Sequence, residues 1–506
     1  MEKVTEPVKI PFEEALDRAG FGLYSYINTF LSGLSIISMA CVVYGSTLTV
    51  GASACELQTT GAQQGLLVAA PVIGLILGAP LWGYLGDTRG RRRMLLLALL
   101  SSALVNAVSG LSVNWVMMMS LQFIASLLGS ADYTLAMTLL SESVPMAKRN
   151  TAVLMVNCMM MVAQGTMAVI AIPIAPLTYS YHLPALDIYW NSWRTLVVAY
   201  SLPSILCAIC YYFMQDSPKL TLVKGDEQRT LQILKTIHRV NFGRSAVLDV
   251  KAVSSEGLIS SAGSKKDQIV PLFQAPLLKN TIIVSCLYMF QLSGSFLAWL
   301  PTIANRVIRM YETGEVNNMN LCGILNADIE MVVDPEATPC AMNTLSLLIV
   351  LGVGVLQCIL NLLITLVIVN RAGRRNTVMI LTAFLGVCGI LVNVVPNTLG
   401  TSVLFAAFLL GYVVMGLYTA IAVALFPTHL RAMAIAVTTT AGNVTSFACI
   451  QLVNFLVSTQ CELGFYLLAS IFASTAIIAS FLPDDRFLQK PSHPNRRKAS
   501  IYIERL

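Results

Sequence analysis

The sequence is poor in charged residues. Asp, Glu, Lys and Arg make up 11% of it, against roughly 25% in a typical globular domain, whereas apolar residues reach 56%. A chain of 506 residues folded in water would need a polar surface over several domains, and so few charges cannot supply it. This shortage excludes a soluble enzyme, a disordered protein and a repeat solenoid. A helical protein that crosses a membrane several times is the remaining class.

Signals of catalysis and of bound cofactors are also missing. The sequence contains no metal-ligand cluster, nucleotide-binding loop or nucleophile triad, so we expect no catalytic residue, no metal, no cofactor and no enzymatic activity. The first 23 residues are acidic and lack the apolar core of a signal peptide. The first apolar run is therefore expected to direct membrane insertion itself.

Long apolar runs are abundant instead. A membrane helix needs about 20 mostly apolar residues to cross the hydrocarbon, and the sequence has twelve such runs. They lie at 24–50, 63–86, 94–113, 115–141, 151–174, 195–214, 280–305, 343–369, 376–396, 401–426, 432–457 and 463–483. The predicted fold class is therefore an all-α membrane protein with twelve transmembrane helices.

Basic residues set the expected orientation. With both termini in the cytoplasm, only Arg194, Arg306 and Arg309 of the 32 Lys and Arg residues lie outside, as the positive-inside rule requires. The net charge of +6 then reflects contact with the anionic inner leaflet, and nucleic acid is not an expected partner. We expect an integral protein of the plasma membrane or of an intracellular vesicle membrane.

The chain divides into two halves that repeat each other. The expected parts are a cytoplasmic segment at 1–23, a six-helix bundle at 24–214, a cytoplasmic linker with an amphipathic helix at 215–279, a second bundle at 280–483 with an outer loop at 306–342, and a basic cytoplasmic tail at 484–506. An arginine-rich turn follows the second run of each half, at 89–92 and at 371–375. Parallel six-helix repeats with a solute site between them are a known transporter design.

Six short motifs stand in order between these runs: Pro11 to Gly22, Gly83-x-x-x-Asp87-x-x-Gly90-Arg91-Arg92, Trp193-Arg194, Met214 to Lys219, Leu234 to Arg239 and Phe426 to Arg431. In them the chain resembles the major facilitator superfamily, and within it the branch of synaptic vesicle glycoprotein 2 and the sugar and organic-ion porters. The resemblance implies two pseudo-symmetric bundles and alternating-access transport of a small organic solute, such as a sugar, an organic ion or a related metabolite, by a functional monomer.

The sequence also departs from that family. The stretch 38–42 of the first run has no acidic residue, although family members carry acids in this run, and Asn370 and Ala424 stand where the second half is expected to have acids. Facilitated transport is therefore favoured over proton coupling. The alternative is a transport-inactive membrane protein, similar to synaptic vesicle glycoprotein 2, that binds or regulates a partner.

Charged residues at the cytoplasmic ends of the helices form a predicted inner gate. Asp87 and Glu142 are expected to pair with the neighbouring arginines in the outward-facing state and to release them in the inward-facing state. The predicted members are Asp87, Arg89, Arg91, Arg92, Glu142, Arg149, Arg374, Arg375 and Arg431. In the alternative interpretation these arginines only set the topology and contact lipid phosphate.

Asp132 is the only charged residue within the predicted spans. A charge near the bilayer centre costs at least about 2.5 kcal/mol, so Asp132 is expected to face a cavity or to be protonated. Solute binding, proton transfer and a hydrogen bond between helices all remain open for it. The hypothetical solute site comprises Asp132, Asn157, Gln164, Tyr288, Gln291, Trp299, Gln357, Asn361 and Asn443. Interhelical hydrogen bonding is the alternative role of each polar residue in this set.

Four of the 12 cysteines lie in predicted outer loops, at Cys55, Cys322, Cys340 and Cys461. Four cysteines allow three pairings. We predict a disulfide between Cys322 and Cys340, because these two share one loop in an oxidising compartment. Four free thiols are the alternative.

Overall fold

The computed structural model describes residues 9–243, 245–254, 270–313, 320–326, 343–364, 373–426 and 430–483. Within them, twelve helical segments are long and apolar enough to cross a membrane, as the sequence predicted. Their observed edges agree with the predicted ones to within a few residues. The fifth segment begins at Met146, directly after Pro145 and five residues before its predicted start, and so takes Lys148 and Arg149 into its first turn.

Six spans form the N-terminal half. The first and the sixth are each made of two consecutive helices. The elements are α2 (Leu23–Tyr44) with α3 (Ser46–Leu57), α4 (Gly61–Arg89), α5 (Arg91–Ser109), α6 (Trp115–Ser143), α7 (Met146–Ala171), and α8 (Ser192–Ala199) with α9 (Leu202–Tyr212). A short antiparallel hairpin of β2 (Tyr181–Leu183) and β3 (Ile188–Trp190) precedes α8.

The other six spans form the C-terminal half, in which two spans are interrupted. The seventh consists of α13, α14 and α15, and the tenth of α20, the 3₁₀ helix η3 and α21. The elements are α13 (Leu277–Met289), α14 (Ser293–Leu297), α15 (Leu300–Thr313), α17 (Thr344–Leu363), α19 (Arg374–Leu391), α20 (Thr398–Leu409), η3 (Leu410–Val413), α21 (Val414–Leu425), α22 (Arg431–Thr459) and α23 (Cys461–Ser480). Short α16 (Leu321–Asn326) lies between α15 and α17.

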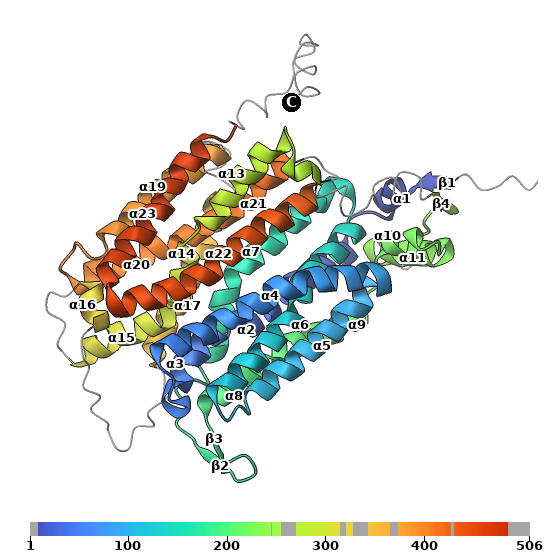
Figure 1. The fold of residues 1–506 in the computed structure, drawn as a ribbon. Helices are drawn as coiled ribbons and strands as arrows, with labels where there is room; N and C mark the ends of the chain where they lie inside the picture. The colour runs from blue at the N-terminus through green and yellow to red at the C-terminus, as the bar shows by residue number, and fades with distance from the viewer. Residues whose placement is uncertain are drawn as a thin grey trace, which may run out of the picture.

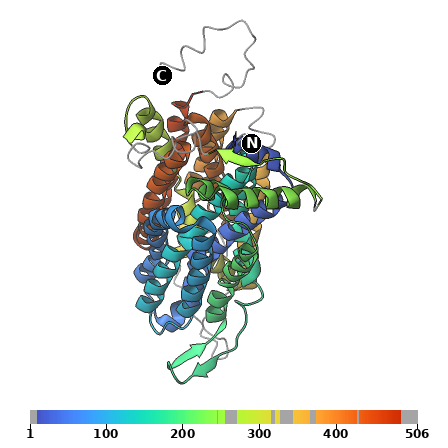
Figure 2. The ribbon, with the colours of Figure 1, turned by 90° about the vertical axis from the view of Figure 1, so that its right-hand side faces the viewer.

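A small lobe covers one end of the N-terminal half. Its elements are β1 (Lys9–Pro11), which pairs in parallel with β4 (Ala252–Ser254), and the helices α1 (Phe12–Ala19), α10 (Pro218–Val223) and α11 (Glu227–Phe242). Helix α11 is the amphipathic helix expected in the linker, and Leu234 and Ile237 on it are fully buried against the N-terminal half. We call this end of the molecule the linker side, and the opposite end, with the β2–β3 hairpin and α16, the disulfide side (Figures 1 and 2).

The two halves lie next to each other with their helices running between the two sides (Figure 1). Helix α4 packs on α22, and α7 packs on α17. The apolar core near the disulfide side contains residues of both halves, such as Leu67 with Leu347 and Ile450. By contrast, each apolar core at the linker side belongs to one half only. Apolar packing between the halves is therefore concentrated toward the disulfide side.

Two glycines at matching positions support the internal repeat. Gly90 ends α4 with φ +110°, and Gly373 precedes α19 with φ +79°. Other residues rarely adopt this region of the backbone map, whereas glycine does so without steric cost. Each glycine thus directly precedes the third span of its half, next to the arginines that begin that span.

Candidate functional site

A charged cluster lies at the linker side of the N-terminal half. Arg91 pairs with Asp87 at 3.1 Å and with Glu142 at 2.7 Å, and both Arg91 and Glu142 are almost fully buried. Glu142 also accepts a 2.5 Å hydrogen bond from the hydroxyl of Ser217, the N-cap of α10. The cluster therefore joins α4, α5, α6 and the lobe, and it brings together three of the residues predicted for the inner gate. All its members belong to one half.

The remaining N-terminal arginines of the predicted gate have other partners. Arg92 donates to the main-chain carbonyls of Tyr211, at 3.0 Å, and Tyr212, which end α9. Arg149 pairs with Glu13 of α1 at 3.0 Å. Arg89 is exposed at the end of α4. These side chains attach the lobe and α9 to the bundle instead of joining the charged cluster.

The C-terminal half carries no matching acidic cluster among the residues that the structure describes. Arg374 donates a 3.1 Å hydrogen bond to the main-chain carbonyl of Ala420 on α21. Arg375 lies half-buried in the first turn of α19. The side chain of Arg431 lies outside the described ones. Arg374, in the first turn of α19, thus bonds to the main chain of α21, whereas Arg91, in the first turn of α5, forms ion pairs.

Asp132 lies inside the N-terminal half. Its side chain is fully buried, one carboxyl oxygen is 3.5 Å from the hydroxyl of Ser38, and Ser35 donates to its main-chain carbonyl at 2.9 Å. Cys207 of α9 is close enough to interact with it electrostatically. The other carboxyl oxygen has no hydrogen-bond partner among the described residues. An ionised carboxylate is costly in such an enclosed place unless a cation or hydrogen-bond donors compensate it.

Three of the six amides predicted for a solute site bond to other helices. Gln291 donates to the carbonyl of Gly411 at 2.9 Å, and Gln357 donates to that of Leu409 at 3.0 Å. The amide of Asn361 is 3.7 Å from the sulfur of Cys158 in the other half. Gln164 and Asn443 are half-buried, Trp299 is 9% exposed, and the side chain of Asn157 lies outside the described ones. Interhelical hydrogen bonding, the alternative role predicted for these amides, is thus observed for three of them.

Two further amides connect the halves near the disulfide side. Gln451 of α22 donates to the carbonyl of Gly65 at 2.8 Å, and Asn454 donates to that of Gly61 at 2.7 Å. A Cβ atom on Gly65 would be only 2.7 Å from the Asn454 amide nitrogen, so glycine is required for this approach. We call Gln451, Asn454 and the two carbonyls the amide clamp. Gln451 and Asn454 stand three residues apart, which places them on one face of α22.

A second network at the disulfide side is centred on Arg194. This side chain is fully buried, pairs with Glu56 at 2.6 Å and donates to the carbonyls of Gly110, at 2.7 Å, and Ser112, at 2.9 Å. Trp193 also donates to Glu56, at 2.7 Å. The network ties α3, the α5–α6 turn and α8 together. The Trp-Arg motif indicated its position, but nothing in the sequence indicated Glu56 as the partner.

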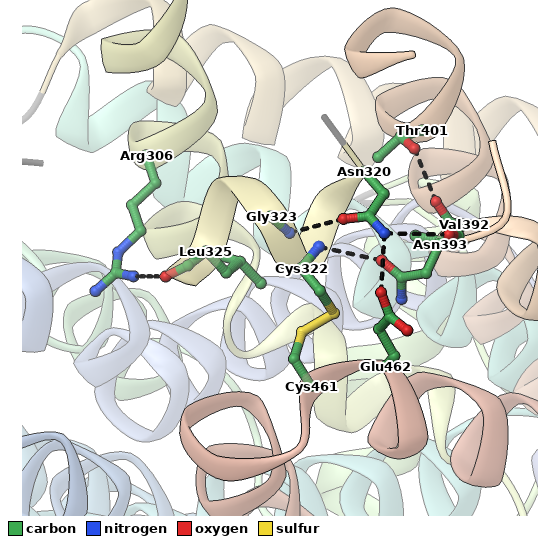
Figure 3. Close-up of a disulfide and its surroundings, with 10 residues drawn as sticks. All are labelled: Arg306, Asn320, Cys322, Gly323, Leu325, Val392, Asn393, Thr401, Cys461 and Glu462. Atoms are coloured by element: carbon green, nitrogen blue, oxygen red, sulfur yellow. Dashed lines mark hydrogen bonds between the residues drawn. A yellow bond between two sulfur atoms is a disulfide. The ribbon is translucent and has the colours of Figure 1, made fainter. Parts of the chain in front are cut away.

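The predicted disulfide between Cys322 and Cys340 is wrong. Cys322 of α16 is bonded to Cys461, the first residue of α23, with the two Cα atoms 5.7 Å apart (Figure 3). Cys340 lies outside the described residues. Asn320 donates to Glu462 at 3.0 Å, and Asn393 accepts from the main-chain nitrogen of Cys322 at 3.1 Å (Figure 3). These bonds hold α16 against the ends of α19 and α23. Cys322 therefore lies next to Cys461, and this nearness in space determines the pairing, whereas membership of the same loop does not.

Comparison with known proteins gives one family. The family model described as the Major Facilitator Superfamily matches residues 26–333. The synaptic vesicle 2-related protein of Xenopus laevis is 23% identical over 95% of this chain and 82% of its own length. The protein svop-1 of Caenorhabditis elegans is 25% identical over 54% of this chain and 49% of its own.

Solved structures give the same fold. A partially occluded inward-open conformation of the xylose transporter XylE from E. coli matches 93% of this chain and 100% of its own length. The TM-score is 0.66 at 15% sequence identity. At this identity the likeness concerns the fold and not the solute. The chain thus has the architecture of twelve-helix transporters and is an integral membrane protein.

Proposed function

The chain belongs to the Major Facilitator Superfamily, and we propose that it carries a small organic solute across a membrane by alternating access. In this mechanism two bundles rock around a site near the midplane, which opens to one side at a time. The twelve spans in two repeated halves supply the moving bodies. The function we propose is transport and not catalysis.

The observation that carries this proposal is the uneven contact between the halves. The amide clamp joins them near the disulfide side at 2.8 and 2.7 Å, and the apolar core there is shared. At the linker side each core belongs to a single half. This uneven distribution of contacts favours a carrier whose solute pathway is closed at the disulfide side and open toward the linker side.

We propose that the linker side faces the cytoplasm, so that both termini are cytoplasmic. Two observations support this orientation. Disulfides persist in oxidising compartments, and the bond between Cys322 and Cys461 lies at the opposite side. Nearly all basic residues of the sequence lie in segments that this orientation makes cytoplasmic, in agreement with the positive-inside rule. The disulfide side then faces the cell exterior or the lumen of a vesicle.

We further propose that transport is facilitated and not driven by protons. The only carboxyl group within the predicted span limits, that of Asp132, lies near Ser38 of α2 and Cys207 of α9 in its own half. A carboxyl group that carries protons has to be accessible from each side of the membrane in turn. Asp132 is fully buried in this structure and is accessible from neither side. The role that its contacts favour is a hydrogen bond between helices.

Flux into proteoliposomes tests the proposal. The purified full chain is reconstituted with a panel of sugars, amines and organic anions, with and without a pH gradient, as wild type and as Asp132→Asn. We expect uptake of at least one solute. This uptake should stop when the solute concentrations inside and outside are equal, should not depend on the pH gradient, and should be unchanged in Asp132→Asn. Uptake driven by the gradient and abolished in Asp132→Asn would overturn facilitated transport.

A second candidate function is a transport-inactive membrane protein that binds a partner. The observation in its favour is the absence of an acidic cluster in the described part of the C-terminal half, where Arg374 bonds to a main-chain carbonyl. The same experiment decides between the two functions. If no member of the panel is taken up by properly inserted wild-type protein, transport is rejected in favour of partner binding.

A further inference from the structure

Four tyrosines meet between the two halves, at the middle of the spans. Tyr44 and Tyr133 come from the first and fourth spans of the N-terminal half, and Tyr288 and Tyr412 come from the first and fourth spans of the C-terminal half. We call these four residues the tyrosine cluster. Each half therefore contributes through equivalent helices, although sequence analysis singled out only Tyr288 as a site residue.

The members of the tyrosine cluster lie near one another across the interface. Tyr44 lies close enough to Tyr412 to interact with it electrostatically, and Tyr133 stands in the same relation to Tyr288. Within the C-terminal half Tyr288 and Tyr412 also interact. In the N-terminal half Tyr44 and Tyr133 pack against one apolar core. The four side chains thus lie in one region of the interface.

Interrupted helices position three of the four rings. Tyr44 is the last residue of α2, directly before the turn residue Gly45 that joins α2 to α3, and Tyr288 stands one residue before α13 ends. Tyr412 lies within the 3₁₀ helix η3, between α20 and α21. Discontinuous membrane helices near the midplane are the places where transporters form their solute sites. A mid-helix 3₁₀ stretch is also a frequent mark of a functional hinge.

The C-terminal rings are held in place from behind. The hydroxyl of Tyr288 lies 2.8 Å from that of Thr419, and its ring packs edge-on against Tyr418 at 5.7 Å between centroids. The ring of Tyr412 lies against Gly294, where a Cβ atom would be 3.1 Å away. Tyr44, Tyr133 and Tyr412 are half-buried, so part of each side chain remains accessible in the middle of the protein.

The chemistry around these rings is uncharged. Asp132, the residue before Tyr133, is turned into its own half and fully buried. Gln291 and Gln357 donate to main-chain carbonyls of the tenth span. The described residues around the cluster therefore offer aromatic faces and phenolic hydroxyls, with no cationic side chain to balance an anion. An unpaired ionic group would be expensive in such surroundings.

We propose that the tyrosine cluster binds an uncharged solute that carries an aromatic ring together with hydroxyl groups. This inference rests on the proposed transport function and names its solute class. The ring of the solute stacks on or packs edge-on against the tyrosine rings, in the arrangements that aromatic pairs prefer. Its hydroxyls bond to the phenolic groups, which both donate and accept. A free sugar offers the hydroxyls without the ring and binds more weakly.

Binding to the purified full chain in detergent tests the solute class. The probes are phenyl glucoside, glucose, tetraethylammonium and benzoate, which separate ring, hydroxyls and charge. We expect thermal stabilisation by phenyl glucoside and by none of the other three at equal concentration. Preferential stabilisation by glucose, by the cation or by the anion, or stabilisation by none, would overturn the proposed class.

Tyrosine variants test the location. Tyr412→Phe and Tyr133→Phe keep the rings, and we expect them to weaken phenyl glucoside binding a few-fold through loss of a hydroxyl. Tyr412→Ala removes a ring, and we expect a loss of about tenfold. The control is Tyr84→Phe, because Tyr84 is 58% exposed on the outer surface of α4. Unchanged binding in both phenylalanine variants, or an equal loss in the control, contradicts the assignment even where Tyr412→Ala does not fold.

Flux measurements distinguish a failure of the proposed solute class from a failure of the proposed transport function. Uptake of phenyl glucoside that falls in the cluster variants supports both. Uptake of a charged or ringless solute that the variants leave unchanged overturns the solute class and leaves transport intact. Phenyl glucoside binding without any uptake supports the cluster as a binding site and overturns transport.

Discussion

The two halves share one fold, but they are held together by different chemistry. The N-terminal half carries a buried ion-pair network at each end, around Arg91 and around Arg194. None of the ion pairs between described residues lies in the C-terminal half. That half is held by the bond between Cys322 and Cys461 and by side chains that bind main-chain carbonyls.

This difference has a mechanical consequence. Buried ion pairs with additional hydrogen bonds fix geometry, because breaking one leaves an uncompensated charge. Amide bonds to carbonyls are weaker and exchange partners at lower cost. The N-terminal half therefore suits a rigid body. The C-terminal half, with its interrupted seventh and tenth spans, is the one in which local rearrangement around the tyrosine cluster is expected.

Breaking the network of Arg194 should have the largest effect. Arg194→Gln leaves Glu56 without its cation and three main-chain carbonyls without a charged donor. Removing one partner of a buried pair costs about 3–5 kcal/mol, so we expect a large fall in the melting temperature of the detergent-solubilised protein. Arg18→Gln is the control, because its pair with Glu14 is half exposed and is worth about 0.5 kcal/mol. Equal melting temperatures of the two variants would show that Arg194 does not brace this half.

Breaking the disulfide is the matching experiment in the other half. Cys461→Ser frees α16 from α23, and loss of a native disulfide typically costs about 2–4 kcal/mol. We expect Cys461→Ser, Cys322→Ser and the double variant to melt at the same lowered temperature, which a reducing agent also produces in the wild type. Cys286→Ser is the control, since Cys286 is a half-buried free thiol. Different melting temperatures for the two single variants would contradict the pairing.

The disulfide also illustrates where sequence reasoning reaches its limit. Twelve spans and the repeated arginine-rich turns follow from hydrophobicity and spacing, which are local properties of the chain. Cysteine pairing instead depends on which helix ends meet in space, and Cys322 and Cys461 are separated by 139 residues. Shared membership of a loop was a poor guide, because Asn393 and Glu462 seat α16 on helices far along the chain.

The candidate site shows the same limit. Asp132 stood out because a charge in an apolar run is conspicuous, yet its orientation into its own half depends on the rotation of α6 against α2. The rings of Tyr44, Tyr133 and Tyr412 were not conspicuous, because aromatic residues are common in apolar runs. Tyr44 and Tyr412 are distinguished only by the irregular turns at Gly45 and at η3, neither of which has a proline to mark it in the sequence. Tyr133 lies within the continuous helix α6 and has no such mark.

A smaller effect is expected from the charged cluster at the linker side. Glu142→Gln removes the charge that faces Arg91 while keeping a group that can accept from Ser217. Hydrogen bonds to charged groups contribute about 1.5–3 kcal/mol, and Asp87 still pairs with Arg91, so we expect the lower part of this range in unfolding measurements. Arg374→Gln at the equivalent turn of the C-terminal half should cost less. A larger loss in Arg374→Gln would reverse the comparison between the halves.

Of these changes, loss of the amide clamp should lower the free energy of unfolding least and should change the ratio of closed to open molecules most. Asn454→Ala removes one neutral hydrogen bond between the halves, which in membranes is worth about 0.6 kcal/mol. Because the bond exists only while the disulfide side is closed, its loss shifts the population of closed molecules and leaves the fold unchanged. Spin labels on α3 and α15 should report a longer distance in Asn454→Ala. Thr440→Ala is the control, since its hydroxyl bonds within α22. An unchanged distance distribution in Asn454→Ala would mean that apolar packing alone closes this side.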